Sequence, residues 1–344
     1  MGIYVFHQGS DGNNLQLWYS TYNGSTWFQD TQVQNLALWD PPAAVGWASG
    51  ISVFHQGWNG EVGPDGNIWC NYTSDGANWG KDTPLPAAQQ GIFGRPSPVV
   101  YSGNGCLYVF YLYGPSTAGD PGFPDPGTCV PPPEALRRSA FGLPPNLQQS
   151  AARQSALRQA DLLYYALTYS YFDGSTWYGP YQIPNVGVIS AVGSAVNWAG
   201  GITVFYQGVD SNYNPDGSLW FVYSADGVNW GGATPVQNVG LSVYPSAVVY
   251  NNNLYVFHQG YGNNGQLWYS VFDGANWAPD TLVTTLAMSG APSAVLWDGI
   301  TVFHQGGGND ETLRFVSSPN GVNWGGDTQV PNVALSNSPS ALVA

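Results

Sequence analysis

Hydrophobic and polar residues alternate along this chain in short runs, and the runs recur about every fifty residues. The most regular run is Val-Phe-His-Gln-Gly, found at 5–9, 53–57, 256–260 and 302–306, with variants at 109–111 and 204–208. Alternation with a period of two is typical of a β-strand. Each copy except the first follows a run of small apolar residues, such as 245–250, which predicts a strand of its own.

Two more strands complete each repeat. Runs of the Leu-Trp-Tyr type, such as 267–269, lead into a turn Asp/Asn-Gly-x-x-Trp, and a short Asp-Thr-x-Val run, such as 327–330, comes after it. Asp-Gly and Asn-Gly favour hairpin turns because both residues tolerate positive φ. The small-apolar strand that is missing before the first copy stands at the other end of the chain, at 339–344. This split repeat is typical of a closed ring.

The sequence therefore predicts an all-β fold, a six-bladed β-propeller with four-stranded blades, in which residues 1–344 form a single domain. We expect the C-terminal strand to join the N-terminal blade and close the ring. Alternate repeats differ by one residue before the turn, and blades two and four have a longer loop after the second strand. This alternation indicates a double blade copied three times.

One segment interrupts the pattern in blade three. An insertion of about fifty residues, roughly 115–160, separates its second and third strands. Residues 114–133 are rich in Pro and Gly and are predicted to form a loop, whereas 145–165 are rich in Ala, Leu, Gln and Arg and predict a helix. The insertion is expected on the face where propellers usually bind ligands. A packing element or a contact that forms an oligomer is the alternative.

The charge limits the partners. Only 8% of the residues are charged and the net charge is −14, which argues against nucleic acid and against an anionic membrane, since both require dense Lys and Arg. No apolar run is long enough to be inserted in a membrane, and the N-terminus lacks a signal segment. Localisation stays open between the cytoplasm and secretion by a non-classical route. A neutral or cationic ligand is expected.

Two sets of repeated side chains are candidates for ligand binding. One position of the second strand carries a hydrogen-bonding side chain in every blade: His7, His55, Tyr111, Tyr206, His258 and His304. The third strand carries an indole at an equivalent position in four blades: Trp18, Trp69, Trp220 and Trp268. Flat aromatic faces stack on the apolar faces of sugars, while polar neighbours bind the hydroxyl groups. Packing between and within the blades is the alternative role for both sets.

The framework of the repeat resembles the six-bladed fungal fucose-specific lectins. The segments 294–297, 302–305 and 267–277 carry this resemblance, and it extends over every blade. In that family a sugar lies between adjacent blades, held by an Arg, a Glu and an aromatic residue. Here the Arg position falls on residues such as Tyr4 and Ser52, and the Glu position on residues such as Tyr19. The resemblance therefore implies the fold, and any sugar specificity must differ.

The turns at 73–79 and 224–230 also resemble the Asp-box of sialidases, one residue short. That box is a structural corner, and the three arginines with which sialidases bind a carboxylate have no counterpart outside the insertion. We therefore expect no sialidase activity.

A loop of blade four has the spacing of a calcium site. Asp210, Asn212, Asn214 and Asp216 alternate with other residues, as oxygen ligands do in calcium loops. Loops rich in Asp, Asn and Gly are also common without a metal, and no distal bidentate Glu follows. Calcium is the only cofactor that the sequence suggests.

These observations favour a carbohydrate-binding protein of the lectin type, with several equivalent sites between blades and glycans or glycoconjugates as partners. Repeated weak sites would gain affinity through avidity. The alternative is an enzyme with one active site on the propeller face, covered by the insertion. A protein-interaction scaffold is the third hypothesis.

Overall fold

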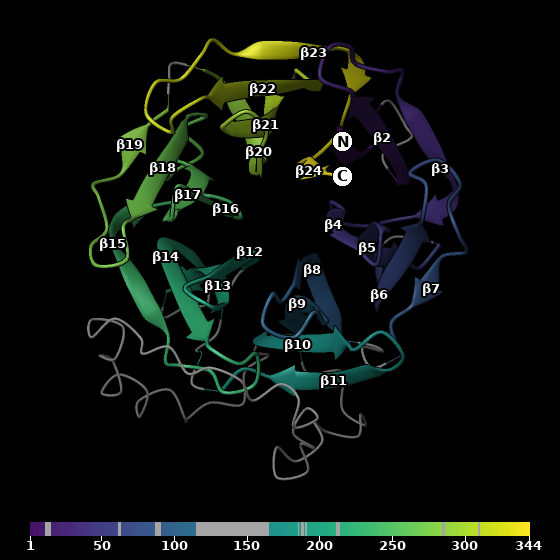
Figure 1. Cartoon of the computed structure of the whole chain (residues 1–344), viewed down its shortest axis with the longest axis horizontal. Helices are drawn as coiled ribbons and strands as arrows, with labels where there is room; N and C mark the ends of the chain where they lie inside the picture. Colours follow the sequence, from purple (N-terminus) through teal and green to yellow (C-terminus); the bar gives the residue numbers. More distant parts are fainter. Residues whose placement is uncertain are drawn as a thin grey trace.

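The structure, a computed structural model, shows six four-stranded antiparallel sheets arranged as the blades of a ring (Figure 1). It describes the chain except residues 11–14, 61–62, 87–90, 115–164, 185, 187–188, 190, 211–213, 284–285 and 309. The predicted all-β six-bladed propeller is confirmed. The predicted helix over 145–165 lies outside the described residues, apart from its last position. No helix in the described part of the chain is long and apolar enough to cross a membrane.

In five blades the strands run outward from the axis in chain order, and in blade one the last strand, β24, lies innermost (Figure 1). Blades one to three consist of β24 (Ser340–Val343), β1 (Ile3–Gln8), β2 (Gln16–Tyr22), β3 (Thr31–Ala37); β4 (Ala43–Trp47), β5 (Gly50–Trp58), β6 (Pro64–Thr73), β7 (Thr83–Pro84); and β8 (Ile92–Val100), β9 (Leu107–Tyr113), β10 (Ala166–Phe172), β11 (Trp177–Gln182). Blades four to six consist of β12 (Ala191–Trp198), β13 (Gly201–Val209), β14 (Pro215–Ser224), β15 (Thr234–Gly240); β16 (Ser246–Tyr250), β17 (Asn253–Gln259), β18 (Leu267–Phe272), β19 (Thr281–Leu282); and β20 (Met288–Leu296), β21 (Ile300–Gly306), β22 (Thr312–Ser318), β23 (Thr328–Ala334).

The ends of the chain close the ring, as the split repeat predicts. β24 pairs with β1 in antiparallel register from Ile3↔Val343 to Phe6↔Ser340. Two backbone hydrogen bonds extend the pairing, from Gly2 N–H to the Ala344 carbonyl (2.6 Å) and from Ala344 N–H to the Gly2 carbonyl (3.0 Å). Blade one therefore contains strands from both ends of the sequence, so the ring cannot open without breaking this sheet.

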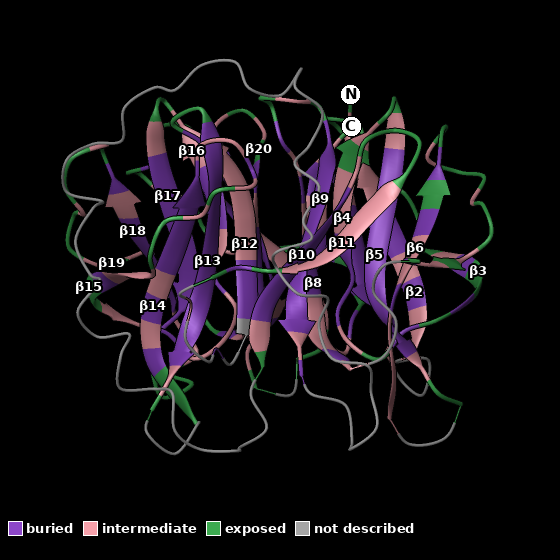
Figure 2. Cartoon of the chain, turned by 90° about the horizontal axis from the view of Figure 1, so that it is seen from below, coloured by how far each residue is buried: buried purple, intermediate pink, exposed green. Residues whose placement is uncertain are grey.

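The core of the ring lies between neighbouring blades, where the strand centres are buried and the loops are exposed (Figure 2). The Phe of each second strand has no exposed surface, and the turn Trp of the next blade packs edge-on against it, as Trp79 does on Phe6 at 5.6 Å and 88°. The same pairing occurs at the other five junctions: Phe54–Trp177, Phe110–Trp230, Phe205–Trp277, Phe257–Trp324 and Phe303–Trp27. The turn tryptophans thus join blade to blade, which explains their recurrence.

The junctions alternate as the double-blade pattern predicts. Three second strands carry a Tyr whose hydroxyl lies against the turn glycine of the next blade: Tyr4 with Gly76, Tyr108 with Gly227, and Tyr255 with Gly321. At the other three junctions the same strand position holds Ser52, Thr203 or Thr301. The ring is therefore built from three pairs of blades with one kind of contact inside a pair and another between pairs.

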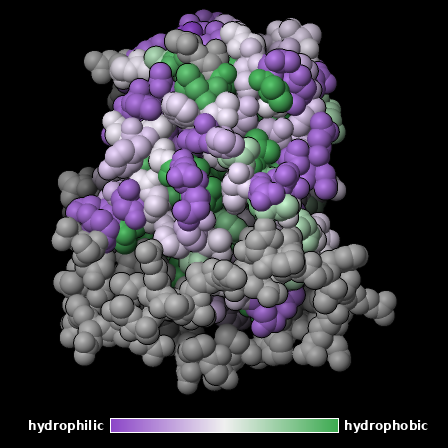
Figure 3. All heavy atoms as spheres, turned by 90° about the vertical axis from the view of Figure 1, so that its left-hand side faces the viewer, coloured by the Kyte–Doolittle hydropathy of each residue, from purple (hydrophilic) through white to green (hydrophobic). Residues whose placement is uncertain are grey.

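At the rim, the outer strands leave polar side chains in solvent. Figure 3 shows the side formed by blades four and five, where hydrophobic residues lie in small separate patches among hydrophilic ones. The −14 net charge is therefore accompanied by a largely polar outer surface on this side.

At the axis, serine hydroxyls connect the innermost strands, which are too far apart in the ring to pair as a sheet. At four junctions a serine Oγ accepts the backbone N–H of the next blade: Ser340 from Ala44 (2.9 Å), Ser97 from Ala195 (2.8 Å), Ser246 from Ala294 (3.0 Å) and Ser293 from Ala341 (2.9 Å). Between blades two and three both partners are missing. Ala43 stands at the serine position, and Pro98 at the position of the donor has no N–H.

This arrangement predicts different effects for two small substitutions. Ser293→Ala leaves the Ala341 amide without its acceptor and should lower the free energy of unfolding by about 1–2 kcal/mol. Ala43→Ser adds a hydroxyl opposite Pro98, which cannot donate, and should not raise stability. Urea unfolding followed by tryptophan fluorescence measures both. A stabilising Ala43→Ser, or a neutral Ser293→Ala, would contradict the proposed role of these hydroxyls.

Candidate ligand-binding cleft

The four histidines of the second strands are fully buried inside their blades. The Nδ1 of His7 lies 3.0 Å from the Gln8 carbonyl, and its Nε2 lies 3.0 Å from Asp30 Oδ1 at the start of the fourth strand. His55, His258 and His304 make the same two contacts, with Asp82, Asp280 and Asp327. Because both ring nitrogens face acceptors, both bonds form together only in the imidazolium. A direct contact of these rings with a ligand stays a prediction, and the contacts observed are with aspartates.

The aspartate partners hold further groups that differ between blades. Ser20 Oγ donates to Asp30 (2.8 Å) in blade one and Ser270 Oγ to Asp280 (3.0 Å) in blade five. In blade six, Arg314 Nε donates to Asp327 Oδ2 at 2.7 Å. Burial raises the pKa of Asp327, but the hydrogen bonds from His304 and Arg314 outweigh it, so its pKa lies below the usual value.

The two tyrosines that replace histidine are also buried. Tyr111 exchanges a hydrogen bond with Ser170 Oγ at 2.8 Å, and burial raises the pKa of both Tyr111 and Tyr206. Because both side chains are buried, neither hydroxyl is accessible as an acid or a base. A contact of these tyrosines with a ligand stays a prediction, as for the histidines.

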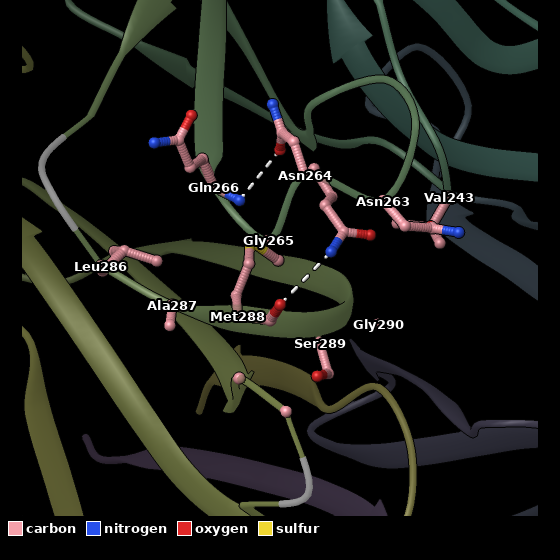
Figure 4. Close-up of a pocket in the computed structure, with 13 residues that line it drawn as sticks. Val243, Asn263, Asn264, Gly265, Gln266, Leu286, Ala287, Met288, Ser289 and Gly290 are labelled. Carbon is pink, nitrogen blue, oxygen red and sulfur yellow. Dashed lines mark hydrogen bonds between the residues drawn. The ribbon is translucent and has the colours of Figure 1, made fainter.

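The Gln of the repeated motif connects each blade to the chain that enters the next blade. Its Nε2 donates to a backbone carbonyl at five of the six junctions: Gln8 to Trp39, Gln56 to Ile92, Gln207 to Leu241, Gln259 to Met288 and Gln305 to Leu335. The pocket beside Gln259, of about 500 Å³, is lined by neutral amides such as Asn263, Asn264 and Gln266 (Figure 4). Its lining contains no aromatic ring and no charged side chain.

The cleft between blades one and two is different, because aromatic and charged side chains meet there. It encloses about 770 Å³ between β3 of blade one and the β5, β6 and turn residues of blade two. Trp58, Trp69 and Trp79 line it together with Asp65, Lys81 and Asp82, and Gln32 and Gln34 face them from β3. A volume of this size is typical of sites for small ligands.

The tryptophan predicted from the third strand is fixed in this cleft by its own hairpin. Trp69 Nε1 donates to Asp65 Oδ2 at 2.7 Å, and Asp65 Oδ1 accepts the backbone N–H of Asn67 at 2.8 Å. The motif glycine, Gly57, makes this contact possible, since a Cβ there would lie 2.4 Å from both Asp65 Oδ2 and Trp69 Nε1. The indole is thus held in one orientation with part of its surface exposed.

His55 reaches this cleft only through Asp82. Its Nε2 lies 3.2 Å from the Asp82 carboxylate, whose side chain keeps 16% of its surface exposed and lines the cleft. The histidine therefore orients an acceptor that a ligand could contact. Sequence reasoning did not find Trp58, Lys81 or Asp82 as site residues. The available signal was the departure from the repeat at Trp58, because the corresponding position holds Val209 in blade four and Tyr261 in blade five.

The other predicted tryptophans occupy similar places without the same surroundings. Trp220 Nε1 donates to Ser218 Oγ at 2.7 Å, whereas the buried Nε1 of Trp18 and of Trp268 has no hydrogen-bond partner among the described residues. In blade four, Gly232 and Ala233 replace Lys81 and Asp82. The four indoles are therefore equivalent in position, and the position of Lys81 holds an uncharged residue in the blades of the other three.

Other predicted features are only partly covered by the structure. In the proposed calcium loop, Asp210 Oδ1 accepts Asn214 N–H (3.0 Å) and Asp216 Oδ1 accepts Ser218 N–H (2.8 Å), whereas Asn212 lies outside the described residues. No cluster of three or more His, Cys, Asp or Glu suited to a metal occurs among the residues described. The insertion at 115–160 lies outside them, so a site beneath it and an oligomer contact through it are not observed.

At three junctions between blades, a tyrosine of the second strand stacks on a tyrosine of the third strand. Tyr4 and Tyr19 stack with centroids 6.3 Å apart, and Tyr108 and Tyr169 with centroids 5.9 Å apart. Tyr255 and Tyr269 stack in the same way at 6.0 Å. The other three junctions have a Ser or Thr at the second-strand position, so the packing of the junctions alternates around the ring.

Comparison with known proteins places the fold. No family model and no curated protein matches the chain. Among solved structures, it is similar to a fucose-specific lectin from Aleuria aurantia (15% identity, 97% of this chain and 93% of that chain, TM-score 0.55). It is also similar to a protein of unknown function from Dyadobacter fermentans (14%, 85% and 82%, 0.55) and to the NanB sialidase from Streptococcus pneumoniae (10%, 85% and 61%, 0.53). At these identities the likeness concerns the fold, and the chain is a six-bladed β-propeller that shares its framework with the fucose-specific lectins.

Proposed function

We propose that this protein binds carbohydrate, and that the cleft between blades one and two is its principal site. The observation that carries the proposal is the meeting of exposed indole surface with carboxylates and amides in one cleft of about 770 Å³. The partners expected are glycans or glycoconjugates. The similarity in fold to a fucose-specific lectin supports the proposal without specifying the sugar.

The residues of the cleft suit the two kinds of surface that a sugar presents. A pyranose has apolar C–H faces that stack on an indole, here Trp58 or Trp69. Its hydroxyl groups donate to carboxylates such as Asp82 and exchange hydrogen bonds with the amide of Gln32. The carboxylates and the net charge of −14 disfavour acidic sugars. Neutral sugars and amino sugars are therefore the expected ligands.

Repetition would add avidity to a weak single site. The indoles at 18, 220 and 268 occupy the equivalent strand position in other blades, and each of these residues is partly exposed. We propose that they bind the same type of sugar more weakly than Trp69, because the charge of Lys81 is not repeated in their blades, where Gln29, Gly232 and Pro279 hold the corresponding positions. Several weak sites on one ring strengthen binding to a multivalent surface.

A glycan array tests this function. We expect wild-type protein to bind a subset of neutral or amino-sugar glycans at multivalent display, and Trp58→Ala to weaken binding of the best glycan by about tenfold or more. Trp39→Ala is the matched control, because Trp39 is 38% exposed but does not line the cleft. Arrays run with calcium and with a chelator also test the loop at 210–216. Binding to no glycan, or equal loss in both variants, would reject the proposal.

A further inference from the structure

The axis of the ring contains a narrow cavity that the proposed carbohydrate site does not use. It has a volume of about 150 Å³ and is lined by the innermost strands of all six blades. Small residues form most of the wall, with Ala43, Ala195, Ala247, Ala294 and Ala341 alternating with serines. Since a water molecule occupies about 30 Å³ in the liquid, the cavity has room for one small ion and a few waters.

Several buried hydroxyl groups face this cavity with a hydrogen that has no protein acceptor. Ser97, Ser293 and Ser340 are 5%, 6% and 3% exposed, and each Oγ accepts a backbone N–H from the next blade. No acceptor for their own hydroxyl hydrogens occurs within the described part of the chain. A buried donor without an acceptor is unfavourable, so these hydrogens require a partner in the cavity.

A guanidinium lies at the same cavity. Arg95 lies in β8, where the register of the strand shifts between Phe93 and Ser97. It reaches across to blades two and one, where Nε donates to the Pro42 carbonyl (3.1 Å) and Nη2 to the Pro339 carbonyl (3.4 Å). Burial lowers its pKa to about 10, so the group remains charged at neutral pH. These two carbonyl groups accept two of its five N–H donors but do not neutralise its charge, and Arg95 is only partly buried.

No carboxylate in the described residues forms an ion pair with Arg95. Asp40 is the acid to consider, because the charges of Asp40 and of Arg95 both act on the pKa of Tyr244. Burial raises the pKa of Asp40 to about 6, whereas a paired guanidinium would lower it. Asp40 and Arg95 form no direct ion pair in the part of the chain that the structure describes.

We propose that the axial cavity binds a small monovalent inorganic anion of the halide class, held by the Arg95 guanidinium and by the hydroxyl hydrogens of Ser97, Ser293 and Ser340. Such an ion supplies both features that the cavity lacks, an acceptor for the hydroxyls and a counter-charge for the guanidinium. Water alone supplies only the first. A cation is disfavoured by Arg95, and the volume excludes larger organic anions. The bound ion connects the inner strands of several blades and stabilises the ring.

Bromide is the probe for the first test. Thermal unfolding is measured in sodium bromide and in sodium methanesulfonate at equal ionic strength. We expect bromide to raise the melting temperature of the wild-type protein by about 3 °C or more, in a saturable manner. Arg95→Gln should abolish this difference. Lys81→Gln removes one positive charge from an exposed residue that does not line the axial cavity, so this variant should keep the difference.

Anomalous diffraction from crystals grown in sodium bromide gives the second test, which needs no variant and decides the matter if Arg95→Gln fails to fold. We expect an anomalous peak on the axis beside Arg95 and the serine hydroxyls. Absence of a peak in this cavity overturns the proposal. Equal melting temperatures of the wild-type protein in the two salts, or a bromide effect that persists in a folded Arg95→Gln variant, overturns it as well.

Discussion

Gly227→Ala is expected to lower the free energy of unfolding by about 2–4 kcal/mol. Gly227 has a φ of +76°, which an alanine adopts with strain, and an added Cβ would lie 2.5 Å from the Tyr108 hydroxyl of the preceding blade. Tyr108 cannot move aside easily, because it has no exposed surface and stacks on Tyr171 at 5.3 Å. The substitution therefore strains the turn and forces the two blades of a pair apart. Urea unfolding measures the loss.

Two further variants separate the strain from the contact. Gly262→Ala has nearly the same φ, +74°, but nothing lies within 4 Å of the added Cβ, so only the cost of the backbone conformation of about 1 kcal/mol is expected. Tyr108→Phe in the Gly227→Ala background removes the hydroxyl that the new methyl group meets and should recover part of the loss. Equal losses for Gly227→Ala and Gly262→Ala, or no recovery in the double variant, would show that this contact does not hold the blades together.

Asp327→Asn is expected to destabilise the protein by about 2–4 kcal/mol at neutral pH. Asp327 accepts from Arg314 Nε at 2.7 Å and faces His304 Nε2 at 3.1 Å. The substitution replaces an ionised acceptor by a neutral amide and leaves a buried histidine and an arginine without their carboxylate. Thermal and urea unfolding, compared with Glu311→Gln as an exposed acid of the same blade, measure the effect.

The effect of this substitution should depend on pH in a defined direction. The pKa of Asp327 is lower in the folded protein than in the unfolded chain, so the unfolded chain binds more protons as the pH falls. The stabilisation by Asp327 is complete above the unfolded pKa, near 3.8, and is lost as the pH falls through the lower folded pKa. The difference between wild-type and Asp327→Asn protein should therefore narrow below about pH 4. A difference that is constant from pH 3 to pH 7 would argue against this ion pair.

Much of the fold could be predicted because the same strand and turn patterns recur in six copies, so each copy supports the assignment of the others. The strand that is missing before residue 5 and present at 339–344 implies a ring, and β24 pairs with β1 accordingly. Period-two alternation predicted the second strand of each blade, and the structure shows these strands as β1, β5, β9, β13, β17 and β21. Local rules suffice for such features, since hairpins and strand faces depend on neighbouring residues.

The candidate site was less predictable because its groups come from distant parts of the sequence. Each buried His meets an Asp that lies 22 to 27 residues later in the chain, on the fourth strand. Repetition identified the position of the histidines but not their aspartate partners. The pattern therefore allowed both roles, contact with a ligand and packing between or within the blades. The cleft at Trp69 likewise combines blade two with Gln32 and Gln34 of blade one.

By itself, the sequence determined the number of blades, the order of strands, the closure of the ring and the alternation of paired blades, because these follow from periodicity and turn chemistry. Only the tertiary structure decided which side chains of neighbouring blades meet. It brings Arg95 to the carbonyls of Pro42 and Pro339, and it places Trp69 in a cleft that Trp58 and Lys81 also line. The physical reason is that a repeat specifies each blade locally, whereas the contents of a cleft depend on the few residues in which the facing blades differ.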